Sequence, residues 1–437
     1  MNLTFHIPLN HFINLLSQIG VQEYINISKH LFQTAKLTLD IAKRVGISAL
    51  SDEDIYLSGL FHDLGLVLKA SIENYEIFKD LFKNIPDLEK LVLTFDTRNT
   101  HSALSYLMCL NLHFLNPNVS RAIIYHHTPY FEIIDETDDV VKLANCIKAA
   151  DEISLNCIRI HGQDINSDFI ENLLEKISQD KGLLEDVKIA ALDSIKDYTE
   201  LFDIIDGFNS FSSKTLLSLE EAKSFAKLFG LLLDMRSPYT RNHTFLVTEI
   251  SKQITLETLS EEDSRLIEIS ALLHDIGKLK IPLGILHKKG PLNDKEMLIM
   301  KSHVVETYKM LVRSGLQNIA NISASHHERL DGSGYPLGIS GKQLTLYSRI
   351  LQIADVFAAL IEPRPYRNAL NIYEAIEIIQ KEVENGKLDK DVFEKLKHII
   401  KNGFLDKFLE NRIRHVFEDF FGKNWEKFSE LVEIDSN

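Results

Sequence analysis

The 437-residue sequence has few cysteines, glycines and prolines and contains no long apolar run. Its three cysteines, Cys109, Cys146 and Cys157, are too few and too odd in number for a disulfide framework or a thiolate zinc site. The 19 glycines and 10 prolines fall below the usual share of each, which disfavours turn-rich β architectures. Because no stretch of about 18 consecutive apolar residues is present, we expect no membrane-spanning helix.

Basic residues are also scarce, since 48 Lys and Arg stand against 63 Asp and Glu for a formal net charge of −15. Such a chain lacks the positive surface that displaces counterions from nucleic acid or binds an anionic membrane. The first twenty residues contain no Lys or Arg and include Pro8 and Asn10, so we expect no signal peptide. These absences predict a cytoplasmic protein that binds neither long nucleic acids nor membranes.

Helical periodicity and histidine are what the sequence has in abundance. Apolar residues recur at helical spacing along most of the chain, as in residues 222–233 and 304–316, and alternating β-branched runs are rare. We therefore predict an all-α fold. The chain also contains 17 histidines, many of which stand beside Asp or beside each other.

These histidines reveal an internal repeat. Residues 57–66 (LSGLFHDLGL) and 269–278 (ISALLHDIGK) are identical at five of ten positions, and further His and Asp residues pair 200 to 213 positions apart. The first copy holds His30, His62, Asp63, His101, His126, His127 and Asp151, and the second holds His243, His274, Asp275, His303, His326, His327 and Asp355. The repeat predicts two tandem helical bundles, a degenerate one over residues 1–165 and a second over 218–437. A helical linker over 166–217, rich in Ser, Asn, Asp and Gly toward its end, would join them.

Imidazole and carboxylate groups are suitable ligands for divalent iron, manganese, zinc or magnesium. The five His and two Asp of the second copy exceed the needs of one tetrahedral zinc and fit two octahedral ions that share Asp275 and a bridging hydroxide. Lys278 follows His274 by one helical turn, so its positive charge lies on the same helix face and could stabilise negative charge that develops beside the metal ions. We therefore predict His274, Asp275 and Lys278 as catalytic residues.

The first copy keeps its seven candidate ligands but lacks the other groups that surround them in the second copy. Leu66 replaces the lysine, and residues 128–131 (TPYF) follow the double histidine in place of an Arg and a Gly-rich loop. The first copy is therefore predicted to be a second metal site that is catalytically silent and that scaffolds or regulates the other copy.

Six segments of the second copy resemble the HD-GYP subgroup of the HD-domain metal-dependent phosphohydrolases. They are YTRNHT (239–244), HDIGK (274–278), MKSH (300–303), HHERLDGSGYP (326–336), ADVF (354–357) and RPYR (364–367), in the family's order. The resemblance implies an all-helical domain that hydrolyses cyclic dinucleotides. It assigns one metal to His243, His274, Asp275 and Asp355, and the other to Asp275, His303, His326 and His327. Two departures matter: Tyr239 replaces the Glu of members that bind a third metal, and Ala358 stands where an acidic residue is common.

The same resemblance implies that the loop after the double histidine shapes the substrate pocket. The substrate-binding residues that it indicates are Lys278, Arg329, Asp331, Gly332, Gly334, Tyr335 and Pro336. Arg364 and Arg367 are expected either to contact the second phosphate or a guanine face, or to be structural. Iron and manganese suit the ligand types about equally well.

The expected activity is hydrolysis of cyclic di-GMP to linear pGpG, with further hydrolysis to GMP left open. A tandem arrangement with a degenerate first domain also resembles the branch that acts on 3′3′-cyclic GMP-AMP to give linear pApG. The HHERLDGSGYP segment argues against a general HD-type nucleotidase or (p)ppGpp hydrolase, and the intact ligands argue against a non-catalytic dinucleotide-binding adaptor. Formation of a homodimer is left open, as is binding of a signalling-domain partner at the loop that contains Gly334, Tyr335 and Pro336.

Overall fold

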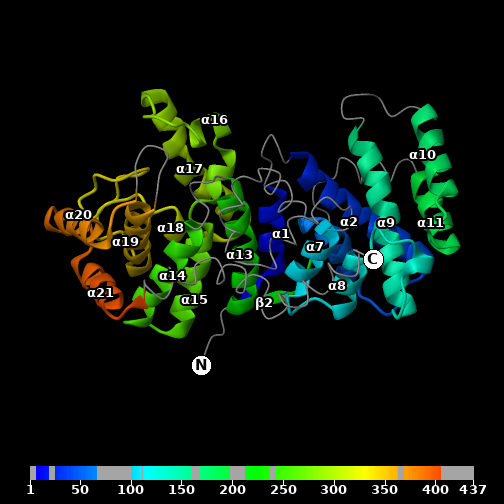
Figure 1. Ribbon diagram of the computed structural model, residues 1–437, viewed down its shortest axis with the longest axis horizontal. Helices are drawn as coiled ribbons and strands as arrows, with labels where there is room; N and C mark the ends of the chain where they lie inside the picture. The colour runs from blue at the N-terminus through cyan, green and yellow to red at the C-terminus, as the bar shows by residue number, and fades with distance from the viewer. Residues whose placement is uncertain are drawn as a thin grey trace. The chain divides into compact units, whose positions relative to one another are not determined.

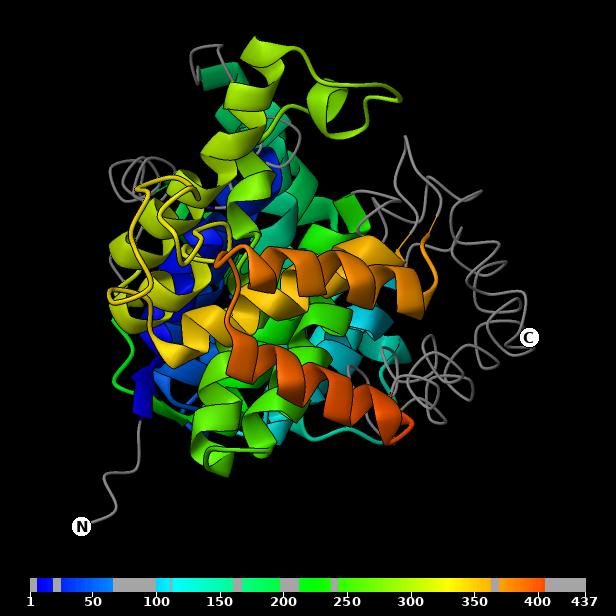
Figure 2. The same cartoon turned by 90° about the vertical axis from the view of Figure 1, so that its left-hand side faces the viewer.

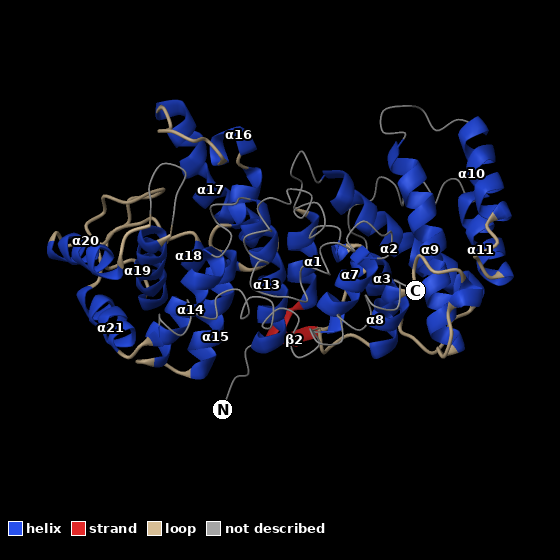
Figure 3. Ribbon diagram, viewed as in Figure 1, coloured by secondary structure: helices blue, strands red, loops and turns tan. Residues whose placement is uncertain are grey.

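The computed structural model describes residues 6–18, 25–65, 100–110, 112–159, 167–196, 212–236, 243–362 and 369–404. Within these ranges the regular structure is helical apart from one short pair of strands (Figure 3), which confirms the all-α prediction. None of the helices described there has the length and apolarity needed to cross a membrane. The chain forms two compact units, which we call the N-terminal unit and the C-terminal unit.

The N-terminal unit contains the described residues between 25 and 213. Its elements are α2 (Ile25–Val45), α3 (Asp52–Phe61), α7 (Thr100–Leu110), α8 (Pro117–Ile124), the 3-10 helix η1 (Tyr130–Glu132), α9 (Asp138–Arg159), α10 (Ser167–Gln179) and α11 (Glu185–Lys196). Helices α2 and α9 are the longest, and they pack against each other along the centre of the unit (Figure 1).

The C-terminal unit combines residues 6–18 with the described residues from 214 to 404. It contains β1 (His6–Pro8), α1 (Leu9–Ser17), β2 (Leu216–Ser218), α13 (Leu219–Arg236), α14 (His243–Leu256), α15 (Glu261–Leu273), η2 (Ile276–Lys280), α16 (Leu283–Leu286), α17 (Asp294–Arg313), α18 (Gln317–Ser323), α19 (Leu346–Ile361), α20 (Ile372–Glu384) and α21 (Lys390–Lys401). Its apolar core lies between α14, α15, α19, α20 and α21, where Leu246, Ile250, Ile353 and Phe357 are fully buried. Helices α20 and α21, orange to red in Figure 2, pack on α19 and cover this core.

The helix that leads to the His-Asp pair begins with the same signal in both units. The Ser51 hydroxyl accepts the backbone N–H of Asp54 at the start of α3, and the Ser260 hydroxyl accepts that of Asp263 at the start of α15. Each Asp carboxylate accepts in return from the backbone N–H of its cap residue, which completes a capping box. Both helices end immediately before a histidine, so their start and length fix where the His-Asp pair lies.

The boundaries of the units differ from those expected from the repeat, because residues 6–18 belong to the C-terminal unit. Strand β1 pairs antiparallel with β2, and the Leu9 N–H donates to the Thr215 carbonyl at 3.0 Å. Helix α1 buries its apolar face, and its Phe12 ring stacks on Phe225 with ring centroids 5.3 Å apart. The amphipathic pattern of this segment predicts a buried face, but it does not reveal which unit buries it.

Residues 167–196, which were expected to belong to the linker, are part of the N-terminal unit. Helices α10 and α11, side by side in Figure 1, are built into the N-terminal unit, where α11 packs on both α2 and α9. The Ser194 hydroxyl on α11 donates to Asp40 of α2 at 2.5 Å, and the Leu184 N–H donates to the Asn145 side chain at 2.9 Å. Residues 167–196 are therefore structural helices, and residues 197–211 lie outside the described part of the chain.

Helix α13 begins with a capping signature, Ser218 followed three residues later by Glu221. The Glu221 N–H donates to the Ser218 hydroxyl at 3.3 Å, and the Ser218 N–H donates to the Glu221 carboxylate at 2.8 Å. Helix α13 then packs on α15, which carries the His-Asp pair of this unit at its end.

Candidate metal centres

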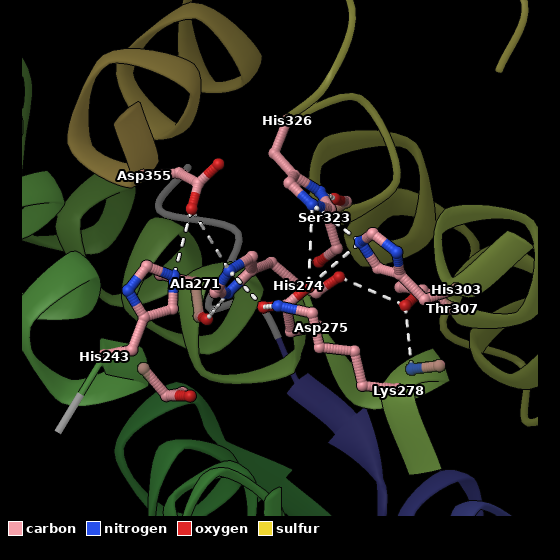
Figure 4. A network of polar contacts seen from close by, with 12 residues as sticks. His243, Ala271, His274, Asp275, Lys278, His303, Thr307, Ser323, His326 and Asp355 are labelled. Atoms are coloured by element: carbon pink, nitrogen blue, oxygen red, sulfur yellow. Dashed lines mark hydrogen bonds and ion pairs between the residues drawn. The ribbon is translucent and has the colours of Figure 1, made fainter. Parts of the chain in front are cut away.

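The structure brings the predicted ligands of the second copy together in the interior of the C-terminal unit. His243 begins α14, His274 and Asp275 follow α15, His303 lies on α17, His326 and His327 follow α18, and Asp355 lies on α19. All but His327 are buried, and His327 is partly exposed. Figure 4 shows four of the imidazoles turned toward the carboxylates of Asp275 and Asp355.

Local backbone geometry fixes the tautomer of three of these imidazoles. The Nδ1 atoms of His274, His303 and His326 each lie 2.6 Å from the carbonyl oxygen three residues earlier in the chain. A carbonyl oxygen only accepts, so each Nδ1 carries the hydrogen and each neutral ring has a lone pair on Nε2. All three lone pairs then face the interior of the centre, as metal coordination requires.

Asp275 lies between the two groups of histidines. Its Oδ1 atom is 3.1 Å from the His303 Nε2 atom and 3.6 Å from the His326 Nε2 atom, while its Oδ2 atom is 3.3 Å from the His274 Nε2 atom. One carboxylate oxygen thus faces each group, which is the arrangement needed for a carboxylate shared by two ions. The other carboxylate, Asp355, has its Oδ1 atom 3.0 Å from the His243 Nε2 atom.

The chemistry of this donor set fits a cation. The Nε2 atom of His274 and the Oδ1 atom of Asp275 are buried and have no hydrogen-bond partner. The Nε2 atoms of His303 and His326 face each other at 3.4 Å. Buried acceptors without a donor are costly, and a divalent cation among imidazole and carboxylate ligands satisfies all of them together.

The protonation states suit metal binding. Burial, reinforced by neighbouring imidazoles, lowers the pKa of His326 to about 3 and holds the pKa of His327 well below its usual value. Burial alone would raise the pKa of Asp275, but the Lys278 ammonium and the nearby imidazoles keep that carboxyl well below its usual range. The pKa of Asp355 is lowered in the same way by its histidine neighbours. Neutral imidazoles and ionised carboxylates are the forms that bind metal.

Lys278 lies on η2 with its ammonium in contact with the Asp275 carboxylate, largely buried at the edge of the centre. The turn that places it there depends on Gly277, where a Cβ would lie 2.0 Å from the His303 carbonyl oxygen. The Thr307 hydroxyl holds the turn to α17, since it accepts the Gly277 N–H at 2.9 Å and donates to the His274 carbonyl at 3.1 Å. Sequence reasoning missed Thr307, although it follows His303 by one helical turn.

The loop after the double histidine folds back toward the centre. Glu328 is buried and accepts the N–H groups of Leu337 and Ile339 at 2.7 and 3.1 Å, which closes the loop. A Cβ at Gly334 would lie 2.4 Å from the Glu328 backbone, so only glycine allows this close approach. The Tyr335 ring stacks on His327 with centroids 4.7 Å apart. Sequence reasoning missed Glu328 as a residue that organises the loop.

The remaining predicted substrate residues shape this loop. The Arg329 guanidinium donates to the Glu328 carbonyl at 2.8 Å, and the Asp331 carboxylate accepts the Ser333 N–H at 2.9 Å. Gly332 has a positive φ of 79°, and Pro336 follows Tyr335 in the loop. The predicted residues Arg364 and Arg367, together with Tyr239, lie outside the described residues.

Sequence reasoning also missed Glu362, which lies at the end of α19. Its Oε2 atom is 2.9 Å from the Nδ1 atom of His243, and both side chains are buried. Ala358, one turn earlier, is fully buried in the apolar core. Ala358 stands where an acidic residue is common in the family, but it offers no carboxylate. The carboxylate that contacts the Nδ1 side of His243 comes from Glu362.

The N-terminal unit contains a second cluster with the same plan. His30 lies on α2, His62 and Asp63 follow α3, His101 lies on α7, His126 and His127 follow α8, and Asp151 lies on α9. The Asp63 Oδ1 atom is 3.2 Å from His101 Nε2 and 3.6 Å from His126 Nε2, and the Asp63 Oδ2 atom is 3.4 Å from His30 Nε2. Asp63 therefore occupies the same position among its histidines as Asp275.

Three backbone contacts in the N-terminal cluster match those of the other unit, although the Nδ1 atom of His101 has no hydrogen-bond partner among the described residues where that of His303 donates to a carbonyl. The Nδ1 atoms of His62 and His126 donate to carbonyl oxygens three residues earlier, at 2.8 and 2.6 Å. The Gly65 N–H donates to the Ser105 hydroxyl at 2.8 Å, as the equivalent glycine does to Thr307 in the other unit. Leu66, which stands at the lysine position, lies outside the described residues.

Comparison with known proteins agrees with this duplication. Two family models, both described as HD domain, match residues 27–156 and 227–392. The 3′3′-cGAMP-specific phosphodiesterase 1 of Vibrio cholerae serotype O1 is 29% identical over 408 residues, which cover 87% of this chain and 88% of that protein. A cyclic di-GMP phosphodiesterase of Thermotoga maritima is 39% identical over 168 residues, 37% of this chain and 45% of that protein.

A solved structure shares the fold. The crystal structure of the V. cholerae cyclic GMP-AMP specific phosphodiesterase V-cGAP3 superposes with a TM-score of 0.56 at 19% identity, covering 91% of this chain and 98% of that one. The chain therefore contains two HD domains in tandem and is homologous to the HD-GYP cyclic dinucleotide phosphodiesterases. This confirms the resemblance read from the sequence, and the homology supports a metal-dependent phosphodiesterase.

Proposed function

We propose that the C-terminal unit hydrolyses a cyclic dinucleotide with the help of two divalent metal ions. The observation that carries this proposal is the buried convergence of imidazole nitrogens and carboxylate oxygens on both sides of Asp275. His243, His274, Asp275 and Asp355 would hold one ion, and Asp275, His303, His326 and His327 would hold the other. Iron and manganese are the proposed metals, because these ligand types suit both.

Bound divalent ions at such a site lower the pKa of a water molecule and offset the charge of the phosphate oxygens. The protein supplies the remaining groups. Lys278 places a cation beside Asp275, where it would hold a non-bridging phosphate oxygen or stabilise the departing sugar oxygen. The loop that Glu328 closes would form one wall of the substrate pocket, with Tyr335 fixed against His327.

The proposed substrate contains guanine in a 3′,3′-linked cyclic dinucleotide. Cyclic di-GMP, opened to linear pGpG, is one candidate, and the Thermotoga relative is named for this activity. Cyclic GMP-AMP, opened to linear pApG, is the other, because the Vibrio relative that spans both domains is named for that substrate. Both candidates need the same in-line attack on phosphorus, so the metal centre does not distinguish them.

The N-terminal unit is proposed to bind metal without hydrolysing substrate. Three of its His–Asp distances, from His30 to Asp151 and from His101 and His126 to Asp63, lie within 0.1 Å of those in the other unit. The segment after its double histidine, Thr128 to Phe131, leads into the short helix η1 and contains no glycine. We therefore assign it a scaffolding or regulatory role.

The decisive experiment is chromatographic product analysis on the full chain, loaded with Mn²⁺ or with Fe²⁺ under anaerobic conditions. Cyclic di-GMP and 3′3′-cyclic GMP-AMP are offered side by side. The double variant His274→Ala with Asp275→Ala should show no turnover of either substrate. Turnover that persists in this variant contradicts the proposal, and tight binding of either substrate without turnover by the wild type would identify an adaptor instead.

A further inference from the structure

The imidazole of His243 lies between two carboxylates of the same helix. Its Nε2 atom is 3.0 Å from Asp355 Oδ1, and its Nδ1 atom is 2.9 Å from Glu362 Oε2. Asp355 lies within α19, and Glu362 is the residue that ends it. Seven residues separate the two, which is about two helical turns, so both carboxylates lie on one face of the helix.

Glu362 lies on the far side of the ring from the metal centre. It contacts Nδ1, whereas the nitrogen that faces Asp355 and the other ligands is Nε2. Glu362 is therefore placed to orient His243 and not to coordinate the ion itself. Its side chain is only 4% exposed, and burying a carboxylate is costly unless a hydrogen bond to it compensates.

His243 differs in this respect from the other histidines of the centre. His274, His303 and His326 each donate from Nδ1 to a neutral backbone carbonyl. Among the described ligands of this unit, only His243 has a carboxylate within hydrogen-bonding distance of Nδ1, since the Nδ1 atom of His327 is 3.9 Å from Asp355 Oδ2. A carboxylate acceptor holds the hydrogen on Nδ1 more firmly and increases the electron density on Nε2, which strengthens the bond to a metal.

The N-terminal unit provides an internal comparison. His30 is the equivalent of His243, and its Nε2 atom is 3.1 Å from Asp151 Oδ1. Its Nδ1 atom, however, is 2.9 Å from the Ser154 hydroxyl, which is neutral. The two clusters thus share their ligands but differ in the group behind the first histidine.

We propose that Glu362 is a positioning residue that holds His243 in its metal-binding tautomer and strengthens the binding of one of the two ions. This inference rests on the proposed function insofar as it takes His243 to be a metal ligand. It concerns only the ion that His243, His274 and Asp355 would hold. The ion on the side of His303 and His326 is expected to be independent of Glu362.

The test is a Mn²⁺ titration of the metal-stripped full chain in competition with a fluorescent chelator, without substrate. Every protein carries Asp63→Asn, so that the N-terminal centre does not contribute. Glu362→Ala should weaken one of the two binding steps by about 10- to 100-fold and leave the other within about twofold. Glu362→Gln, which keeps the shape but loses the charge, should fall between Glu362→Ala and the parent.

The matched control is Glu268→Gln. Glu268 is also buried in the C-terminal unit, but its carboxylate pairs with Lys223 at 3.3 Å on α13. This variant should lower the melting temperature of the metal-free protein and leave both Mn²⁺ affinities unchanged. A structural role alone for Glu362 would give the same result as this control.

Equal Mn²⁺ affinities in the Glu362 variants and the parent overturn the inference, as does an equal weakening of both binding steps. If Glu362→Ala does not fold, Glu362→Gln decides by the same comparison. Failure of the parent to bind Mn²⁺ would instead refute the proposed function and this inference with it, so the two failures are distinguishable.

Discussion

The Nε2 atoms of His303 and His326 face each other at 3.4 Å inside the C-terminal unit. Both rings use their Nδ1 hydrogen for a backbone carbonyl, so in the neutral form each presents a lone pair to the other. Two lone pairs at this distance repel unless a positive species lies between or beside them. Backbone geometry at these two residues thus prepares the site for a cation before any cation binds.

Asp275→Asn and Asp63→Asn form the first prediction. Asp275 contacts three histidines of its own unit and Asp63 contacts four, so loss of either carboxylate charge should release metal from that unit. Only Asp275→Asn should abolish hydrolysis, by at least about 100-fold, if the N-terminal centre is silent. Metal content by mass spectrometry and turnover of both dinucleotides check this, and a comparable loss of turnover in both variants would contradict it.

Lys278→Met tests the cation beside the metal centre. The ammonium contacts the Asp275 carboxylate, and its loss should lower kcat by about 10²- to 10³-fold while the protein still binds metal. Lys288→Met serves as the control, because Lys288 pairs with Glu296 away from the centre. Steady-state kinetics and metal content are the measurements. A Lys278 variant with unchanged kcat would remove this residue from the catalytic group.

Gly277→Ala should disturb the fold around the centre. The new Cβ would lie 2.0 Å from the His303 carbonyl oxygen and 2.5 Å from the Thr307 nitrogen, both backbone atoms of α17. We expect a loss of about 3 kcal/mol in the free energy of unfolding of this unit, measured with urea. Gly284→Ala is the matched control, since nothing lies within 4 Å of its Cβ, and should change stability by less than about 1 kcal/mol.

Two histidines should give opposite pH dependences of stability in the metal-free protein. Burial, together with His274, lowers the pKa of His326 to about 3 in the folded state. The unfolded chain, with a histidine pKa of about 6.5, then binds the additional proton between these values. The contribution of His326 to stability is therefore complete above about pH 6.5 and declines as the pH falls toward 3.

His30 behaves in the opposite way. Burial alone would lower its pKa, but Asp151 and Asp63 outweigh burial and raise the pKa to about 9. Its contribution is complete below about pH 6.5 and is lost as the pH rises toward 9. Urea unfolding at pH 5, 7 and 9 checks both signs. His326→Gln should reduce the change in the free energy of unfolding between pH 5 and 7, and His30→Gln should reduce the change between pH 7 and 9. An exchange of these two effects would refute the assignment.

Phe12→Ala tests whether α1 packs in the C-terminal unit. Phe12 is fully buried and stacks on Phe225 of α13, so truncation should cost the C-terminal unit about 3–5 kcal/mol. Leu216→Ala in β2 is the control, because Leu216 is 59% exposed and should change stability by less than about 0.5 kcal/mol. Domain-resolved hydrogen exchange shows which unit is affected, and a loss confined to the N-terminal unit would contradict the structure.

The sequence alone predicts the all-α fold and the grouping of both ligand sets. It does so because apolar residues recur at helical spacing and because the order of His and Asp is repeated along the chain. The contact between Glu362 and His243 could not be predicted, because the two residues are 119 positions apart in the sequence and no local motif includes Glu362. Residues 6–18 show an apolar face, but periodicity does not reveal the partner that buries it. The roles of individual ligands and the expected metal count remain predictions.

The pairing of β1 with β2 has a consequence for biosynthesis. The N-terminal unit is inserted between two segments of the C-terminal unit, since residues 6–18 join a body whose remaining described residues begin at 214. During translation, α1 leaves the ribosome long before α13 exists to cover Phe12. The apolar face of α1 therefore stays uncovered until the N-terminal unit has been synthesised and α13 follows it. A chaperone that shields α1 would act on the nascent chain before α13 is synthesised.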